Sequence, residues 1–315
     1  MAEWHGVTTN SAGHVTKINL TENGLYGQIA PELGSLPHLE KLFLGKNDLS
    51  GSIPVELGDL AKLQDLHLDR NRLSGRIPRD LGDLSQLHNL LLNDNLLTGP
   101  VPSELGDLTK LQVLRLERNQ LSGHIPSELG DLHSLRTLNL GKNKLSGPIP
   151  RDLGDLSQLR RLVLNDNQLT GPFPSSLRRL SNLEILHTDY NELTGPIPLW
   201  ISGLRNLEWL TIGGNDLTGS IPPSLGTLPE LWLLGLHRTK LTGSIPPDLG
   251  DLPKLKRLYL FESNLTGRIP ASLGDLDNLT HIFLYGNRLT GCVPPFYKDV
   301  ESNDFNRLDL PACDE

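Results

Sequence analysis

The sequence repeats itself every 24 residues, and this period constrains the fold more than any other feature. The consensus LxxLxLxxNxLxGxIPxxLGxL returns twelve times without an insertion or a deletion. Its Asn position recurs at 23, 47, 71, 95, 119, 143, 167, 191, 215, 239, 263 and 287, and only Thr239 and Ser263 depart from Asn. The Gly four residues later is invariant from Gly27 to Gly291. A fixed period of this length predicts a solenoid, in which each unit buries its apolar face against its neighbours.

Each repeat carries the local signals of such a unit. Leucines recur at every second position, as at Leu42 and Leu44, and mostly alternate with polar residues, as at Leu66 and Leu68. This pattern predicts a short half-buried strand. The Asn side chain that follows has donors and an acceptor, so stacked Asn residues can form a ladder that satisfies buried backbone groups. Thr239 and Ser263 each keep one hydroxyl, so we expect the ladder to weaken there without breaking. Thr188 replaces a core Leu, and we expect slightly looser packing from there onward.

The consensus resembles the leucine-rich repeat family, and the segment L-S/T-G-x-I-P resembles its plant-type subclass, found in polygalacturonase inhibitors and receptor-kinase ectodomains. The resemblance covers almost the whole chain. It implies an α/β solenoid, a curved right-handed coil with a parallel β-sheet on the concave face and short strand, 3-10 and turn segments on the convex side. We expect one domain over 1–315, with a lead-in strand in 1–22, about twelve rungs in 23–291 and a C-terminal cap in 292–315.

The two ends of the chain carry further points of resemblance. Cys292 and Cys313 are the only cysteines, and their segment resembles the disulfide-closed cap of extracellular family members. The resemblance implies a Cys292–Cys313 disulfide, and two free thiols are the alternative. The segment beginning at Trp4 resembles the WxGVxC lead-in of the family, but Thr8 and Thr9 stand where plant members have a cysteine. In this respect the chain is similar to cysteine-poor bacterial and algal members.

Composition limits the location and the partners. A net charge of −8 and a pI near 5.7 argue against a nucleic acid or an anionic membrane as partner. No apolar run reaches membrane-spanning length, and the first residues hold no secretion signal, so the sequence is a domain cut from a longer precursor or an intracellular protein. The cysteine pair favours an extracellular or cell-surface location, and we expect a monomer. Asn19, Asn264 and Asn278 begin N-x-S/T glycosylation triplets, although the repeat itself generates N-L-T.

The solvent-facing strand positions are free of a folding role and predict the candidate site on the concave face. Aromatic residues gather in rungs eight to twelve, namely Tyr190, Trp209, Trp232, Tyr259, Phe261, Phe283 and Tyr285. Since exposed aromatic and Arg residues dominate binding hot spots, we predict that they bind a ligand together with Arg257. Phe283 and Tyr285 lie beside the cap and can equally pack under it. Arg115 and Arg161, from the mixed-charge rungs three to seven, are further candidates, and ion pairing between neighbouring strands is the alternative.

Other chemistries have less support in the sequence. Seven aspartates recur at rung spacing, Asp59, Asp83, Asp107, Asp131, Asp155, Asp251 and Asp275, but calcium needs several converging oxygen ligands, so solvated loop residues are the better interpretation. A file of threonines, Thr170, Thr194, Thr218, Thr242, Thr266 and Thr290, suggests an ice-binding array, yet these hydroxyls belong to the common repeat. His187 and Asp189 come closest to a catalytic dyad, and a surface ion pair explains them better. We expect no enzyme, no cofactor and no metal.

Three functions remain open. The first is a non-enzymatic recognition module that binds a protein, peptide or glycan through the concave face. The second is a structural or adhesive spacer of a cell-surface protein, supported by the near-identical blocks at 77–87 and 149–159. The third is an inhibitor of a cell-wall-degrading enzyme, which resembles the plant inhibitors but has different ends and face residues.

Overall fold

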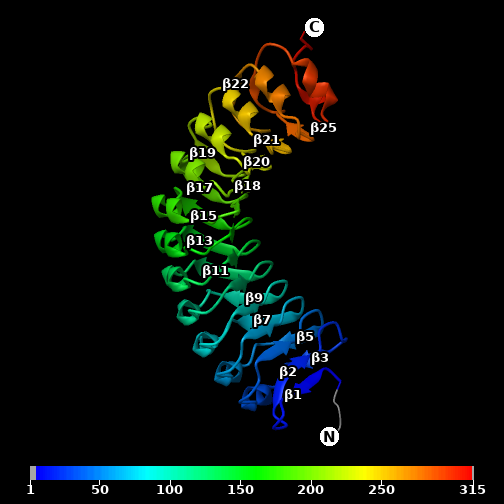
Figure 1. The fold of residues 1–315 in the computed structure, drawn as a ribbon, viewed down its shortest axis with the longest axis vertical. Coiled ribbons are helices and arrows are strands. Elements are labelled where there is room, and N and C mark those ends of the chain that lie inside the picture. The colour runs from blue at the N-terminus through cyan, green and yellow to red at the C-terminus, as the bar shows by residue number, and fades with distance from the viewer. Residues whose placement is uncertain (1–4, 314–315) are drawn as a thin grey trace. The chain divides into compact units, whose positions relative to one another are not determined.

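The computed structural model describes residues 5–313 of the chain, so the prediction about Trp4 lies outside the described residues. The chain divides into two compact units, Met1–Leu159 (unit 1) and Arg160–Glu315 (unit 2). Each unit is a stack of rungs that follow one another in chain order (Figure 1). The expectation of one domain over 1–315 stays a prediction.

Each unit contains a main sheet of short strands, one from each rung. In unit 1 these strands are β1 (Val7–Thr9), β2 (Val15–Asn19), β4 (Lys41–Phe43), β6 (Asp65–His67), β8 (Asn89–Leu91), β10 (Val113–Arg115) and β12 (Thr137–Asn139). In unit 2 they are β14 (Arg161–Val163), β16 (Ile185–His187), β18 (Trp209–Thr211), β20 (Leu233–Gly235), β21 (Arg257–Tyr259), β23 (His281–Phe283) and β25 (Ser302–Asn303). All pairs within each unit are parallel except β1 with β2, in which the lead-in strand runs antiparallel.

The register of the main sheet follows the sequence period residue by residue. Asp65 is paired with Lys41 on one side and with Asn89 on the other, each 24 residues away. Because side chains alternate across a strand, the middle residue of each strand from β4 to β23 enters the core, and Leu42, Leu210 and their counterparts in these strands have no exposed surface. The predicted strand positions are therefore confirmed.

A second set of strands follows most of the main strands, after the Asn position. In unit 1 it comprises β3 (Tyr26–Gln28), β5 (Asp48–Gly51), β7 (Arg72–Arg76), β9 (Leu96–Gly99), β11 (Gln120–His124) and β13 (Lys144–Pro148). In unit 2 it comprises β15 (Gln168–Gly171), β17 (Glu192–Pro196), β19 (Asp216–Thr218), β22 (Thr266–Gly267) and β24 (Arg288–Leu289). The invariant glycine bends the chain here, with φ near 79° at Gly51, a left-handed conformation that residues with a Cβ rarely adopt.

Single 3-10 turns complete the rungs and form a file along one side of each unit (Figure 1). In unit 1 they are η1 (Pro31–Ser35), η2 (Val55–Asp59), η3 (Arg79–Asp83), η4 (Ser103–Asp107), η5 (Ser127–Asp131) and η6 (Arg151–Asp155). In unit 2 they are η7 (Ser175–Arg179), η8 (Leu199–Gly203), η9 (Pro223–Thr227), η10 (Pro247–Asp251), η11 (Ala271–Asp275), η12 (Pro295–Asp299) and η13 (Phe305–Arg307). Pro54 precedes η2 in extended backbone, with φ −63° and ψ 136°, so the Ile-Pro pair sets the entry into each turn.

The Asn ladder is present in both units. At Asn95, Nδ2 donates to the carbonyl oxygens of Leu68 and Leu92 at 3.0 and 3.1 Å, and Oδ1 accepts the N–H of Leu73 at 3.0 Å. Leu68 and Leu73 belong to the preceding rung, so each Asn joins two rungs. These bonds satisfy backbone groups that the stack removes from water.

The two exceptions to the ladder are linked to each other by hydroxyls. Thr239 Oγ1 lies 3.0 Å from Ser263 Oγ and donates to the carbonyl of Leu236 at 2.9 Å. The ladder thus thins without breaking, as expected. In the second set of strands, no strand forms between β19 and β22. The backbone is still paired there, because the Lys240 N–H donates to the Leu217 carbonyl at 2.9 Å. The core leucines of these rungs stay fully buried.

Thr188 fills a core leucine position in unit 2. Its side chain is completely buried, and its hydroxyl has no hydrogen-bond partner within residues 5–313. Replacing Thr188 by the isosteric valine is expected to raise the free energy of unfolding by about 1–2 kcal/mol, because it removes an unpaired buried hydroxyl. Urea denaturation measures the change.

Thr211→Val is the matched control for this prediction. Thr211 is also buried, but its Oγ1 accepts the indole N–H of Trp209 at 2.9 Å. This second substitution is expected to lower stability, and stabilisation by both valines would contradict the assignment.

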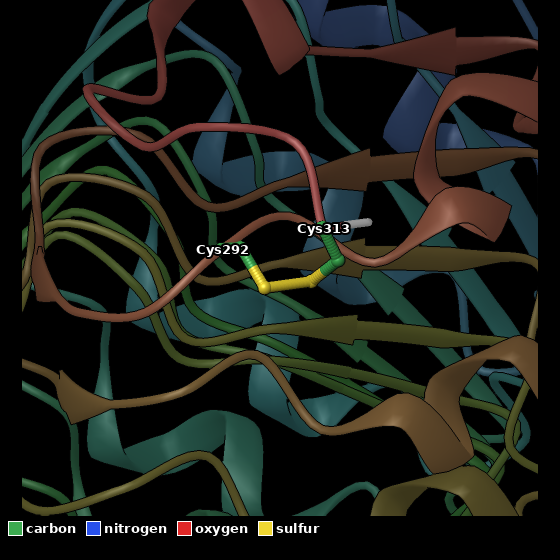
Figure 2. Close-up of a disulfide and its surroundings, with 2 residues drawn as sticks. All are labelled: Cys292 and Cys313. Atoms are coloured by element: carbon green, nitrogen blue, oxygen red, sulfur yellow. A yellow bond between two sulfur atoms is a disulfide. The ribbon is translucent and has the colours of Figure 1, made fainter. Parts of the chain in front are cut away.

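The C-terminal cap is closed by the Cys292–Cys313 disulfide (Figure 2), which confirms the pairing that the resemblance implied. Beside it, the Val293 N–H donates to the Pro311 carbonyl at 2.8 Å. Under the cap, buried Asp304 accepts the backbone N–H groups of Leu284 and Tyr285 through Oδ2, at 2.7 and 2.6 Å. One rung earlier, the equivalent N–H of Leu260 donates to the Phe283 carbonyl at 2.9 Å, so Asp304 takes the place of a backbone carbonyl that a following rung would supply.

Across residues 5–313, no helix has the length and apolar character of a membrane span.

Candidate functional site

We call the outward side chains of the main strands of unit 2, with the residue two positions beyond each strand, the strand face of unit 2. Its three columns begin at Arg161, Val163 and Asn165 and advance by 24 residues per rung. The columns contain all the predicted aromatic residues except Tyr190 and Trp232. The register therefore brings seven of the predicted binding residues of unit 2 onto one surface: five aromatics, Arg257, and Arg161 at the first rung.

One line of stacked rings crosses this face. The rings of His237 and Phe261 are 4.6 Å apart between centroids, and those of Phe261 and Tyr285 are 5.0 Å apart with an interplanar angle of 8°. The Arg307 guanidinium, from the cap, lies 3.2 Å from the centroid of Tyr285, a cation–π contact. Phe261 and Tyr285 are half-buried against each other, so Tyr285 contacts both the cap and the strand face.

A second group of rings lies on the neighbouring columns. Trp209 stacks with His187 at 5.4 Å, and Tyr259 meets Phe283 at 5.7 Å. All four side chains are half-buried. The aromatic residues contact one another and cover one another more than the sequence indicated. Their binding role stays a prediction.

Trp232 and Tyr190 lie outside the three columns, at the two margins of the face: Trp232 before its strand and Tyr190 after its strand. Trp232 immediately precedes β20, on the side of the sheet where the strands begin. Its ring centroid is 5.9 Å from that of Trp209, and the Arg257 guanidinium lies 5.8 Å from the centroid. Tyr190 precedes the ladder residue Asn191 and adopts φ 55°. Its side chain is 42% exposed, and its ring meets His237 edge-on at 5.8 Å. Tyr190 is thus the most accessible aromatic of the group.

The polar groups of this face centre on Asp189, which is buried. Its Oδ1 accepts the Gly213 N–H at 2.6 Å, and its Oδ2 lies 3.3 Å from Nε2 of His187. Burial lowers the pKa of His237, although the Asp189 carboxylate partly opposes the shift. The carboxylate can accept a hydrogen bond from a ligand or form an ion pair with its ammonium group.

The lowered pKa of His237 predicts a pH dependence of stability. In the unfolded chain this His takes up a proton as the pH falls through its ordinary value near 6.5, whereas the folded chain takes it up only at lower pH. Its contribution to stability is thus present above pH 7 and is lost as the pH falls below 6.5. We expect His237→Gln to reduce the loss of thermal stability between pH 7.5 and 5.5. His133→Gln, at an exposed position, serves as control, and equal slopes in both variants would contradict the prediction.

The corresponding outward positions of unit 1, its strand face, are mostly polar, and several of their charged side chains are paired with one another. Lys41 Nζ lies 2.8 Å from the carboxylate of Asp65, which also accepts from Asn89 at 2.5 Å. Burial alone would raise the pKa of Asp65, but hydrogen bonds from Lys41 and Asn89 outweigh it and lower that pKa. Arg115 pairs with the largely buried Glu117 on its own rung. Arg115 is thus ion-paired within its own rung and not between neighbouring strands, whereas Arg161 is exposed on β14. A binding role for either residue stays a prediction.

Two repeated files lie away from the strand faces. The seven aspartates of the L-G-D-L element are exposed at the last residue of their 3-10 turns. Within the described part of the chain, no three His, Cys, Asp or Glu side chains are grouped as metal ligands. Four members of the threonine file lie on the second strands of unit 2, and five of the six are exposed.

The sequence reasoning missed the burial of His237 and Asp189, and it missed Glu208 and Lys256 altogether. His237 and Asp189 belong to the predicted columns, yet their burial depends on neighbours in adjacent rungs, among them Gly213. Glu208 and Lys256 occupy the repeat position immediately before a strand, the same position as Trp232. A 24-residue column drawn through Trp232 would have found them.

Stacked rungs in a fixed parallel register define the molecule as a solenoid repeat protein. Family models described as "leucine-rich repeat region" and "leucine rich repeat" match residues 19–146 and 157–217. Among solved structures, the leucine-rich repeat protein LIC12759 of Leptospira interrogans is 31% identical, with a TM-score of 0.68 over 88% of this chain and 75% of that one. The chain belongs to the leucine-rich repeat family and has the plant-type form of the repeat.

Two plant structures are also similar. The plant peptide hormone receptor RGFR1, solved in complex with RGF2, is 38% identical with a TM-score of 0.87, over 92% of this chain and 46% of that one. A plant ice-binding protein is 26% identical with a TM-score of 0.69, over 99% of this chain and 88% of that one. The chain spans less than half the length of RGFR1. Comparison with curated proteins gave no match.

Proposed function

We propose that the chain is a non-enzymatic recognition module that binds a peptide or protein ligand through the strand face of unit 2. The observation that carries the proposal is the ring contacts on this face, in which Trp209 stacks with His187, Tyr259 meets Phe283 at a tilt, and Phe261 stacks with His237 and Tyr285. The repeat consensus does not require these rings. Aromatic surface with adjacent polar groups is typical of binding hot spots. The similarity to a peptide hormone receptor supports a peptide as ligand.

The polar centre of the face suits a peptide in particular. Asp189 and His187 lie beside Trp209, so a ligand in contact with the indole also reaches a carboxylate and an imidazole. A peptide backbone or a basic side chain can bond to these groups while its apolar side chains cover the rings. We further propose an extracellular or cell-surface location, which the disulfide supports because disulfides are rare in the cytosol.

Selection of displayed random 12-residue peptides on the whole protein tests this function. Trp209→Ala and Tyr259→Ala are each expected to weaken the selected peptides about tenfold or more, because each removes a large aromatic contact surface. Tyr26→Ala is the control, since Tyr26 is 87% exposed on β3 of unit 1, and it should leave affinity unchanged. Fluorescence anisotropy measures the affinities. Failure to enrich any peptide, or equal affinities for all variants, would contradict the proposal.

Ice binding is a second candidate, favoured by the exposed threonine file of unit 2 and by the similarity to a plant ice-binding protein. Thermal hysteresis of the whole protein tests it, and its absence at millimolar concentration would remove the candidate. The spacer and the enzyme inhibitor stay open as sequence-based hypotheses. Removal of three rungs from unit 1 should be tolerated by a spacer.

A further inference from the structure

A groove lies along the edge of unit 2 where the main strands begin, outside the strand face. Its larger hollow encloses about 370 Å³ and is lined by Glu208, Glu230, Trp232, Lys254, Lys256 and Asn278. A second hollow of about 270 Å³ shares Glu208 and Glu230 and extends the groove to Arg160. The larger hollow alone has the size of a small-molecule site, which is about 300–1,000 Å³.

The backbone fixes three of these residues in one column. The Trp232 N–H donates to the Glu208 carbonyl at 2.9 Å, and the Lys256 N–H donates to the Trp232 carbonyl at 2.8 Å. Neighbouring strands lie about 4.8 Å apart, so the indole stands between a carboxylate on one rung and an ammonium group on the next. The contacts of Trp232 with Trp209 and Arg257 restrict its ring.

The polar groups of the groove are only partly engaged. Lys254 forms an ion pair with Glu230, and Asn278 donates through Nδ2 to the Pro253 carbonyl at 3.0 Å. Glu208 and Lys256 are exposed, and their side chains make no hydrogen bond or ion pair with the described residues. The Trp232 ring is therefore flanked by a free acceptor, Glu208, and a free donor, Lys256. The Asn278 amide can form further hydrogen bonds.

This chemistry selects a class of ligand. Two carboxylates and two ammonium groups give the larger hollow no net charge, so it exerts little long-range attraction on a charged molecule. Hydroxyl groups both donate and accept, and they can bond to Glu208 and Lys256 at once. The apolar face of a sugar ring can cover the indole. We propose that the groove binds a neutral oligosaccharide, with a sugar ring on Trp232 and its hydroxyls bonded to Glu208, Lys256 and Asn278.

Isothermal titration of the whole protein with cellotetraose, mannotetraose, laminaritetraose and chitotetraose tests the proposal, with the tripeptide Lys-Gly-Glu as a zwitterionic probe. At least one tetrasaccharide should bind. Trp232→Ala should weaken it about tenfold or more. Glu208→Ala and Lys256→Ala should each weaken it about threefold to tenfold through a lost hydrogen bond. Tyr26→Ala, in unit 1, should leave the affinity unchanged.

Glu208→Ala and Lys256→Ala keep the test decisive if Trp232→Ala disturbs the fold, because both residues are exposed and neither substitution alters a buried contact. Their thermal unfolding should match that of the wild type. The proposal is overturned if no tetrasaccharide binds, if binding is the same in Glu208→Ala, Lys256→Ala and the wild type, or if only the tripeptide binds.

Discussion

Replacing Asn95 by alanine is expected to lower the free energy of unfolding by about 3–5 kcal/mol. The buried amide bonds to Leu68, Leu73 and Leu92, and the substitution leaves those backbone groups without partners inside the stack. Each unsatisfied buried group costs about 1–3 kcal/mol. Urea unfolding followed by circular dichroism measures the loss.

Asn23→Ala is the matched control, because Asn23 occupies the same repeat position. Asn23 is exposed, and its side chain forms no hydrogen bond with the described residues, so the change should stay below about 0.5 kcal/mol. Asn95→Thr keeps a hydroxyl, as at Thr239, and should fall between the two. Equal losses for Asn95→Ala and Asn23→Ala would show that the ladder has no energetic role.

Replacing Asp304 by alanine is expected to lower the free energy of unfolding of the C-terminal cap and last rung by about 3–5 kcal/mol. The carboxylate accepts two backbone N–H groups and the hydroxyl of buried Tyr297. Both N–H groups would lose their partner, and the hydroxyl would keep only the Ile282 carbonyl at 3.4 Å. Burial and the adjacent Asp304 carboxylate together raise the pKa of Tyr297, so the Tyr297 hydroxyl stays a neutral donor. Rungs contact only their neighbours, so the cap should open before the remaining rungs unfold.

Hydrogen exchange distinguishes this outcome from uniform destabilisation. Amides from 281 to 300 should exchange faster in Asp304→Ala, while those of β16 and β18 keep their protection. Asp299→Ala, at an exposed position of the same cap, should change neither region. Loss of protection throughout unit 2 would contradict local opening.

The fold followed from the sequence because a single periodic pattern specifies it. Leu42 and Leu44 point inward as their alternation predicts, and Asp65 pairs with the residues 24 positions away on both sides. Each rung repeats the same local physics, so a correct interpretation of one rung extends to the others. The one disulfide followed from the resemblance of the cap.

The candidate site was less accessible to sequence reasoning, since it depends on side-chain contacts between rungs. The columns placed Trp209 and Phe261 on one face, but alternation alone does not show that their rings stack and become half-buried. Asp304 lies outside the repeat pattern, so no period pointed to its role. The groove beside Trp232 was missed because its residues precede the strands and belong to none of the three columns.

The constant 24-residue register has a consequence for inheritance. The near-identical blocks at 77–87 and 149–159 lie three rungs apart, and both belong to unit 1. Unequal recombination between their coding sequences would delete or duplicate three whole rungs, and each surviving strand would meet a neighbour in the same register. The gene can therefore vary in length while the strand face and the groove of unit 2 are transmitted unchanged.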